Sequence, residues 1–204
     1  MIDTVFLDEL SSKAPTPGGG GASAYCGALA AALGAMVGYL TEGKKSFVAI
    51  NDQVLESIAR LEASRAKLTA LIGADAEVFK PLAACYSMPK DTDEEKKARE
   101  EALQAALVPA CQVPLDIMQN VMDVLHEDDF LAHNGTRLGV SDAGVCAVFA
   151  KAALQGASFN VFINTKAMTD TSKAQSLNEA CEAMLASGCA LADEIYTYVL
   201  EQVR

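Results

Sequence analysis

Apolar residues recur along most of the chain with the period of an α-helix. On one long segment they return every three, four or seven positions, at Ile50, Val54, Ile58, Leu61, Leu68 and Ile72. The same spacing predicts a last helix from about Thr171 to the C-terminus. No alternating apolar and polar stretch with hairpin signals stands out. We therefore predict an all-α fold, an up-and-down bundle with some kinked helices, in a single domain covering residues 1–204.

One apolar segment, residues 18–41, has no charged residue and is long enough to cross a membrane. It follows a break at Pro15-Thr16-Pro17 and a run of four glycines, and it ends near Gly43. Because the segment is mostly alanine and glycine, it has little hydrophobic tendency to enter a membrane. We identify no second stretch of this kind. We expect a central helix of a bundle, or one between subunits, whose small residues let neighbouring backbones approach closely.

Local signals predict where other helices begin, bend and end. Residues 91–95 offer N-cap chemistry and first-turn acids for a helix that passes two prolines, where kinks or a break are expected. A polar connector is predicted from His126 to Gly139. Further boundary signals are a possible interruption at Gly73, a helix cap at Ser141-Asp142, and a helix end near Ile163.

The composition excludes some classes of protein. There are 16 Lys and Arg against 27 Asp and Glu, a net charge of −11, which argues against nucleic acid as a main partner. Aromatic residues are only 6% of the chain, with no tryptophan, which disfavours strands. Six cysteines without a metal or haem spacing are expected to be reduced core thiols of a cytoplasmic protein. Met1-Ile2-Asp3 lacks the basic region of a signal peptide.

Two segments suggest anion binding. The backbone N–H groups at Gly18, Gly19 and Gly20 precede a helix and could hold an anion or a flat ligand, although composition alone slightly favours a flexible loop. Residues 38–45 nearly form a phosphate-binding loop, but Lys45 replaces the required Ser or Thr and a helix precedes it, so we reject that reading. Lys44 and Lys45 remain a pair of positive charges, which is ordinarily only a solvated helix end.

Asp75 is the most informative acidic residue. In a helix it shares a face with Ile72 and Phe79, and burial of a carboxylate raises its pKa, as a proton shuttle near neutral pH requires. A surface or capping role for Asp75 is about equally favoured, and Glu77 is expected in solvent. The two histidines, His126 and His133, show no metal-binding spacing and are expected in the exposed connector, so no metal site is predicted.

Together these segments resemble the cyclodeaminase/cyclohydrolase family of folate one-carbon metabolism, in order along nearly all of the chain. The matching stretches are Phe6-Leu7-Asp8-Glu9-Leu10, Pro15 to Gly20, Gly43-Lys44-Lys45, Asp75-Ala76-Glu77 with Phe79, Pro89-Lys90 with Thr92 and Glu94-Glu95-Lys96, Val113-Pro114-Leu115, Ser141-Asp142, and Asn160-Val161 with Ile163-Asn164.

The resemblance implies an all-helical homodimer that binds tetrahydrofolate in a cleft, with no cofactor beyond this substrate carrier and no metal. It places the catalytic carboxylate on Asp75. The substrate-binding residues that it implies are Gly18, Gly19, Gly20, Lys44, Lys45, Ser141, Asp142, Asn160 and Asn164. Two positions depart from the usual pattern: Gly21 stands where a serine is common, and Gly73 where an acid is common.

The implied reaction is the conversion of 5-formiminotetrahydrofolate to 5,10-methenyltetrahydrofolate and ammonia, with Asp75 as the proton shuttle. Hydrolysis of methenyltetrahydrofolate to 10-formyltetrahydrofolate is the alternative, and a non-catalytic folate-binding or scaffolding domain is a third. A separate formiminotransferase is a possible partner, and neither nucleic acid nor membrane is expected to be one. Since the protein is acidic, Lys44 and Lys45 are expected to hold the anionic glutamate tail, with Lys166 and Arg137 as helpers.

Overall fold

The computed structural model describes residues 4–204, which form helices and no strands. The α-helices are α1 (Thr4–Leu10), α2 (Gly19–Thr41), α3 (Asn51–Tyr86), α4 (Asp93–Asn134), α5 (Val140–Thr165) and α6 (Thr171–Val203). Two short 3₁₀ helices, η1 (Lys45–Ile50) and η2 (Arg137–Gly139), lie in the connections. The prediction of an all-α fold is confirmed.

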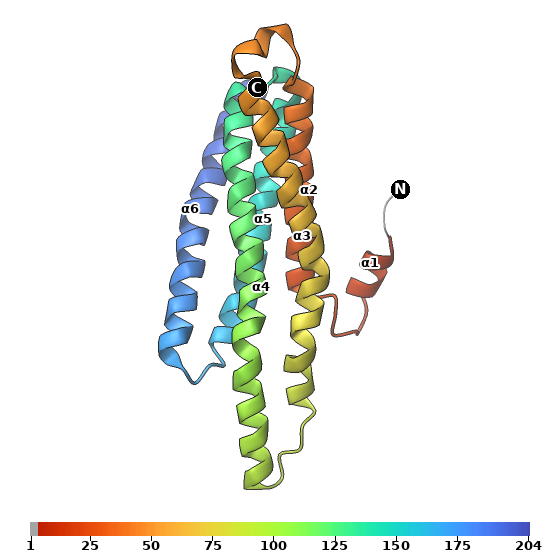
Figure 1. The fold of residues 1–204 in the computed structure, drawn as a ribbon, viewed down its shortest axis with the longest axis vertical. Helices are drawn as coiled ribbons and strands as arrows, with labels where there is room; N and C mark the ends of the chain where they lie inside the picture. Colours follow the sequence, from red (N-terminus) through yellow and green to blue (C-terminus); the bar gives the residue numbers. More distant parts are fainter. Residues whose placement is uncertain (1–3) are drawn as a thin grey trace.

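The helices from α2 to α6 run alternately up and down (Figure 1). The first four of these close a ring, since α2 packs on α3 and α5, and α4 packs on the same two helices. The last helix, α6, covers α5 and part of α4. At one end the hairpin of α3 and α4 projects beyond the other helices, while α1 stands beside the bundle (Figure 1). This arrangement is the predicted up-and-down bundle.

The small residues of α2 bring neighbouring helices close, as predicted. A Cβ atom at Gly27 would lie 2.9 Å from Cγ2 of Val121 on α4, and one at Gly38 would lie 2.5 Å from Cγ1 of Ile58 on α3. Both glycines are buried in the middle of the bundle. Any larger side chain at these positions would force the helices apart.

Two helical segments of residues 4–204, rather than one, are long and apolar enough to cross a membrane by length and composition: Gly19–Thr41 and Arg137–Thr165. The expectation of a single such stretch was therefore wrong. In the bundle, 56% of the first window and 44% of the second are buried. Asp142 and Lys151 interrupt the charge-free run of the second segment, which is why it escaped notice in the sequence.

Several expected boundaries were also wrong. Helix α3 continues through Gly73, and α4 continues through Pro109 and Pro114, so of the expected kinks or breaks the breaks do not occur. The segment from His126 to Asn134 is the last part of α4, since Leu131 and Ala132 stay buried and its polar residues other than Asp128 lie at or near the surface. The connector between α4 and α5 is only residues 135–139. Helix α5 begins at Val140, with Gly139 as its N-cap, so the residues 141–142 lie in its first turn and do not cap it.

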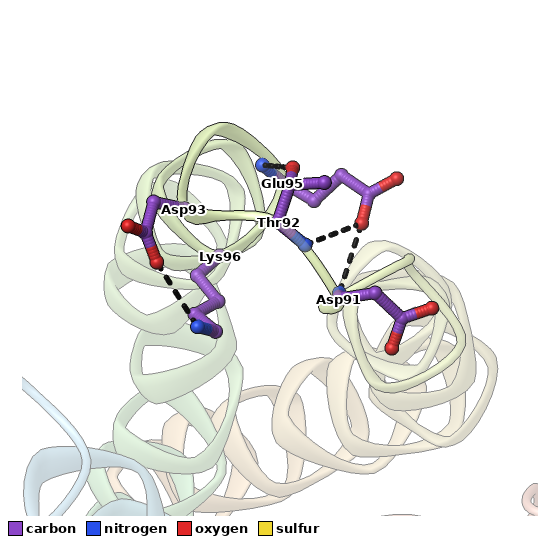
Figure 2. Close-up of polar contacts among 5 residues, drawn as sticks. All are labelled: Asp91, Thr92, Asp93, Glu95 and Lys96. Atoms are coloured by element: carbon purple, nitrogen blue, oxygen red, sulfur yellow. Dashed lines mark hydrogen bonds and ion pairs between the residues drawn. The ribbon is translucent and has the colours of Figure 1, made fainter.

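The start of α4 was predicted correctly. Thr92 Oγ1 accepts a hydrogen bond from the backbone N–H of Glu95 (3.2 Å), and Glu95 Oε2 accepts in return from the N–H groups of Thr92 (3.0 Å) and Asp91 (2.8 Å) (Figure 2). Lys96 pairs with Asp93 at 3.0 Å in the same turn. This capping box marks the start of α4, at the projecting tip of the hairpin that α3 and α4 form.

All six cysteines are free thiols, as predicted. Four of them, Cys85, Cys111, Cys146 and Cys181, are buried in the bundle. Burial raises the pKa of Cys111 and of Cys181 to about 11, so these thiols stay protonated and act as small core residues.

Candidate active site

A pocket of about 170 Å³ lies at the end of the bundle where the loop from α1 enters α2. Its walls come from this loop and from four helices of the ring. The lining residues are Pro15, Thr16, Gly18, Gly19, Gly20, Asp75, Val78, Phe79, Ala110, Asn160, Ile163 and Asn164. Six of the ten residues that the sequence assigned to the site therefore meet here, although they are as far as 146 positions apart in the sequence (164 − 18).

The glycine run holds the carboxylate of Asp75 at the N-terminus of α2. The backbone N–H of Gly21 donates to Asp75 Oδ2 at 2.9 Å. A Cβ atom at Gly20 would collide with the same carboxylate, so only glycine leaves room for it. Since the N-cap residue, Gly18, has no side chain to cap the helix, Asp75 supplies that cap from α3. The anion at this helix end is thus part of the protein itself.

Asp75 is the single ionisable side chain among the residues that line the pocket. Burial raises the pKa of its carboxyl group, and the hydrogen bond from Gly21 opposes this without cancelling it. Phe79 provides an apolar wall beside it, as the helical pattern predicted, and Val78 extends this wall, whereas Ile72 is not among the lining residues. Glu77, two positions away, lies in solvent and pairs with Lys80 at 2.6 Å. The arrangement gives one carboxyl group that can hold or release a proton closer to neutral pH than an ordinary aspartate.

Two asparagines of α5 present oxygen atoms to the pocket. Asn160 Nδ2 donates to the Gly156 carbonyl and Asn164 Nδ2 donates to the Ala110 carbonyl, each at 3.1 Å. Each amide nitrogen is thus bound to backbone, and no residue among 4–204 donates to either Oδ1 atom. With the carboxylate of Asp75, these two side-chain oxygens can accept hydrogen bonds from the N–H groups of a ligand.

Four of the residues assigned from the sequence lie elsewhere. Lys44 and Lys45 follow the far end of α2, where Lys44 Nζ donates to Thr136 Oγ1 at 3.2 Å. Helix α2 has 23 residues, so about 33 Å separates this end from Gly18. Ser141 and Asp142 begin α5 at that same distant end, and Ser141 lines a separate apolar groove between α5 and α6.

Of the two helper residues suggested from the sequence, only one lies near the pocket. Lys166 follows Ile163 by three positions, so the two are neighbours on the exposed side of α5. Arg137 lies at the distant end, where it donates to Gln202 at 3.4 Å. Lys166 is therefore the candidate cation at the pocket mouth within one chain.

Sequence reasoning missed several lining residues, among them Thr16, Ala110 and Ile163. Ala110 did leave a signal, because Pro114 four positions later removes the N–H that would normally bond to its carbonyl. Thr16 and Ile163 gave no chemical signal of their own, since one is a loop residue and the other an ordinary apolar residue of a helix. Their role follows only from the packing of the helices.

The histidines do not form a second site. His133 stacks on Tyr198 of α6, with ring centroids 3.9 Å apart, and its Nδ1 contacts the carbonyl of Asp129. Within residues 4–204, no group of three or more His, Cys, Asp and Glu side chains is placed to hold a metal ion. His133 instead packs the end of α4 against α6 through this stacking contact.

Comparison with known proteins agrees with this geometry. Residues 4–183 match the formiminotransferase-cyclodeaminase family. The chain is 40% identical over 198 residues to a methenyltetrahydrofolate cyclohydrolase of Methylorubrum extorquens, covering 97% of this chain and 95% of that protein. It is 38% identical over 173 residues to the formimidoyltransferase-cyclodeaminase of Mus musculus, covering 83% of this chain but only 32% of that longer protein.

Structural similarity extends over the whole fold. The crystal structure of a formiminotetrahydrofolate cyclodeaminase from Thermotoga maritima superposes with a TM-score of 0.82 at 28% identity, covering 99% of this chain and 95% of that one. The fold and the sequence thus both match the cyclodeaminase/cyclohydrolase class of folate proteins. The chain belongs to the formiminotransferase-cyclodeaminase family.

Proposed function

We propose that this protein is an enzyme of folate one-carbon metabolism that acts at the bridge between N5 and N10 of tetrahydrofolate. The observation that carries this proposal is the pocket in which Asp75 is the single ionisable lining residue, in a chain of this family. The first reaction we assign is formiminotetrahydrofolate cyclodeamination, as in the protein from Thermotoga maritima.

The chemistry requires a group that moves a proton between two nitrogens. N10 attacks the formimino carbon and gives a tetrahedral carbon in a five-membered ring; N10 then loses its proton. The bond from this carbon to the former imino nitrogen breaks after that nitrogen is protonated, and ammonia leaves. Asp75 takes the first proton and supplies the second, which requires a carboxyl pKa closer to the working pH, the direction in which burial shifts it. The N–H groups at Gly18 to Gly20 contact the pterin or the reacting bridge.

A second reaction, the hydrolysis of methenyltetrahydrofolate, is favoured by one observation. The cyclohydrolase from Methylorubrum extorquens matches this chain almost end to end. In this reaction Asp75 removes a proton from water as the water oxygen attacks the methenyl carbon, which gives a tetrahedral carbon that bears a hydroxyl group in place of the amino group. The bond from this carbon to N5 then breaks, N5 takes up the hydroxyl proton, and the formyl group stays on N10. One pocket therefore suits both reactions at the bridge between N5 and N10.

The test supplies the purified protein with each folate in turn and follows the absorbance of the methenyl product. Rising absorbance with 5-formiminotetrahydrofolate, together with ammonia release, supports cyclodeamination. Rapid loss of absorbance with methenyltetrahydrofolate, beyond the uncatalysed rate, supports hydrolysis. Tight folate binding without either reaction would contradict both assignments and favour the non-catalytic role.

We also infer that the protein works as a homodimer, through the apolar faces of α2 and α5. Leu29, Met36 and Tyr39 lie seven and three positions apart on one face of α2, and each is at least 41% exposed. Phe159 and Ile163 extend the exposed apolar surface on α5, which packs against α2. An exposed apolar surface of this kind is typical of contacts between subunits.

A further inference from the structure

Pro114 lies inside α4, four positions after Ala110, which lines the pocket, and is buried. In an α-helix the N–H of residue 114 would bond to the carbonyl of Ala110, but proline has no N–H. Its ring also crowds the carbonyl four positions earlier and tilts it out of the helix. The Ala110 carbonyl is therefore available to a donor from another helix.

That donor is Asn164 of α5. Its Nδ2 reaches the Ala110 carbonyl at 3.1 Å, across 54 positions of sequence, and both residues line the pocket. Since a carbonyl accepts only N–H or O–H donors, this bond fixes which end of the carboxamide faces α4. The Oδ1 atom points away from Ala110 and receives no hydrogen bond from residues 4–204.

We propose that Pro114 is a positioning residue for substrate binding: it frees the Ala110 carbonyl to hold Asn164, whose Oδ1 then accepts a hydrogen bond from an N–H group of the bound folate. This inference rests on the proposed function. Several parts of the substrate carry such a donor, among them the pterin ring, N10 and the formimino nitrogen. Pro114 itself touches neither.

Pro109 in the same helix provides a matched comparison. It too removes an N–H, this time from the carbonyl of Ala105, but Pro109 and Ala105 are both exposed. No side-chain hydrogen bond to the Ala105 carbonyl is found in residues 4–204. The two prolines therefore make the same change in α4, and only Pro114 is connected to the pocket.

The experiment compares Pro114→Ala, Pro109→Ala and Asn164→Leu with the wild type. Each alanine restores a helical N–H, so neither proline variant loses thermal stability. In Pro114→Ala the new N–H competes with Asn164 for the Ala110 carbonyl, so KM rises about three- to tenfold, as for one lost hydrogen bond, while kcat changes less than about twofold. Pro109→Ala leaves KM unchanged.

Non-additive effects of the two substitutions on KM would show that Pro114 and Asn164 act through the same hydrogen bond. Asn164→Leu raises KM at least as much as Pro114→Ala, and the double variant is no worse than Asn164→Leu alone, because both changes remove the same bond. The Kd for unsubstituted tetrahydrofolate locates the donor. A weakened Kd assigns it to a group that tetrahydrofolate itself carries, such as the pterin or N10, and an unchanged Kd with a raised KM assigns it to the formimino nitrogen.

An active wild type whose KM is unchanged by Pro114→Ala would overturn this inference and leave the proposed function intact. Additive losses in the double variant would also overturn it, since they would mean that the two residues act separately. If Pro114→Ala did not fold, an unchanged KM in Asn164→Leu would decide against the proposal. A wild type that neither binds nor converts any of the folates would overturn the proposed function, and this inference with it.

Discussion

At the scale of single residues, Asp75 combines two roles that the sequence left as alternatives. One oxygen, Oδ2, caps α2 through the N–H of Gly21, while the carboxyl group as a whole lines the pocket. The cap holds the side chain in place without a salt bridge, and a fixed cation would have lowered the pKa of the carboxyl further. A structural contact thus orients the group that we propose transfers the proton.

Replacement of Asp75 by Asn should separate these two roles. The Asn carbonyl oxygen can still accept from Gly21, so the melting temperature is expected to stay within a few degrees of wild type. Without a proton to transfer, kcat is expected to fall about 10²- to 10⁴-fold. The control is Glu77→Gln, an exposed acid two positions away, which should leave kcat unchanged. Full activity in Asp75→Asn would refute the catalytic assignment.

A second buried acid, Asp128, predicts how stability depends on pH. Asp128 is fully buried in α4, neither carboxylate oxygen has a conventional hydrogen-bond partner in residues 4–204, and its neighbours are the Cys146 thiol and the adjacent Asp129. Burial raises the pKa of Asp128 well above its ordinary value. Because the folded state then binds this proton more tightly than the unfolded chain, stability falls as pH rises above about 4.

The Asp128→Asn variant removes that titration. Its free energy of unfolding should match wild type near pH 4 and exceed it increasingly as pH rises, by about 1.4 kcal/mol per pH unit until the folded pKa is passed. Urea unfolding at several pH values measures the difference. Asp123→Asn, an exposed acid one turn earlier in α4, is the control and should show no such trend. Parallel pH curves for Asp128→Asn and wild type would contradict the prediction.

At the scale of helices, the sequence predicted the features that local chemistry determines. The helix start at residues 91–95 and the last helix from about Thr171 depend on neighbours within a turn or two, and both were found where expected. The passage of α4 through Pro114 could not be predicted this way, because the freed carbonyl is satisfied by Asn164 from another helix. The end of α4 was missed for a similar reason: His133 is held in the helix by stacking on Tyr198.

The glycines of α2 and α3 lead to a contrasting pair of predictions. A Cβ at Gly20 would collide with Asp75, so Gly20→Ala should displace the carboxylate and lower kcat/KM at least about tenfold. A Cβ at Gly73 would meet nothing within 4 Å, so Gly73→Ala should stabilise the protein by about 0.5–1 kcal/mol with unchanged activity. Steady-state kinetics and urea unfolding of the two variants test both statements. Equal activity in the two variants would mean that the glycine is not needed for placing Asp75.

At the scale of the whole molecule, the site could be predicted only in part. The family resemblance correctly grouped Asp75, Asn160 and Asn164 with the glycine loop. It also named Lys44 and Lys45, but sequence order says nothing of which end of a bundle a residue occupies. Those lysines lie about 33 Å away along α2, at the opposite end. If Lys44 and Lys45 hold the tail of a folate, that folate is not bound in the pocket of their own chain.

A symmetric dimer provides a way to bring the lysine pair at one end of α2 near a pocket at the other end of the helix. When a two-fold axis crosses α2 at right angles, the two copies of α2 run antiparallel, so the end of one helix lies near the start of the other. The exposed apolar face at Leu29, Met36 and Tyr39 is on this helix. The lysine pair of one subunit would then lie near the pocket of its partner, and would offset the net charge of −11 where an anionic tail binds.

Mixing two defective variants tests this arrangement. One variant carries Asp75→Asn, and the other carries Lys44→Ala with Lys45→Ala. If the lysines act on the partner's pocket, a mixed dimer contains one site with both defects and one fully intact site. Random equimolar mixing should therefore restore about a quarter of wild-type activity at substrate concentrations below KM, where either variant alone is weak. If the lysines act within their own chain, every site keeps a defect and mixing restores nothing.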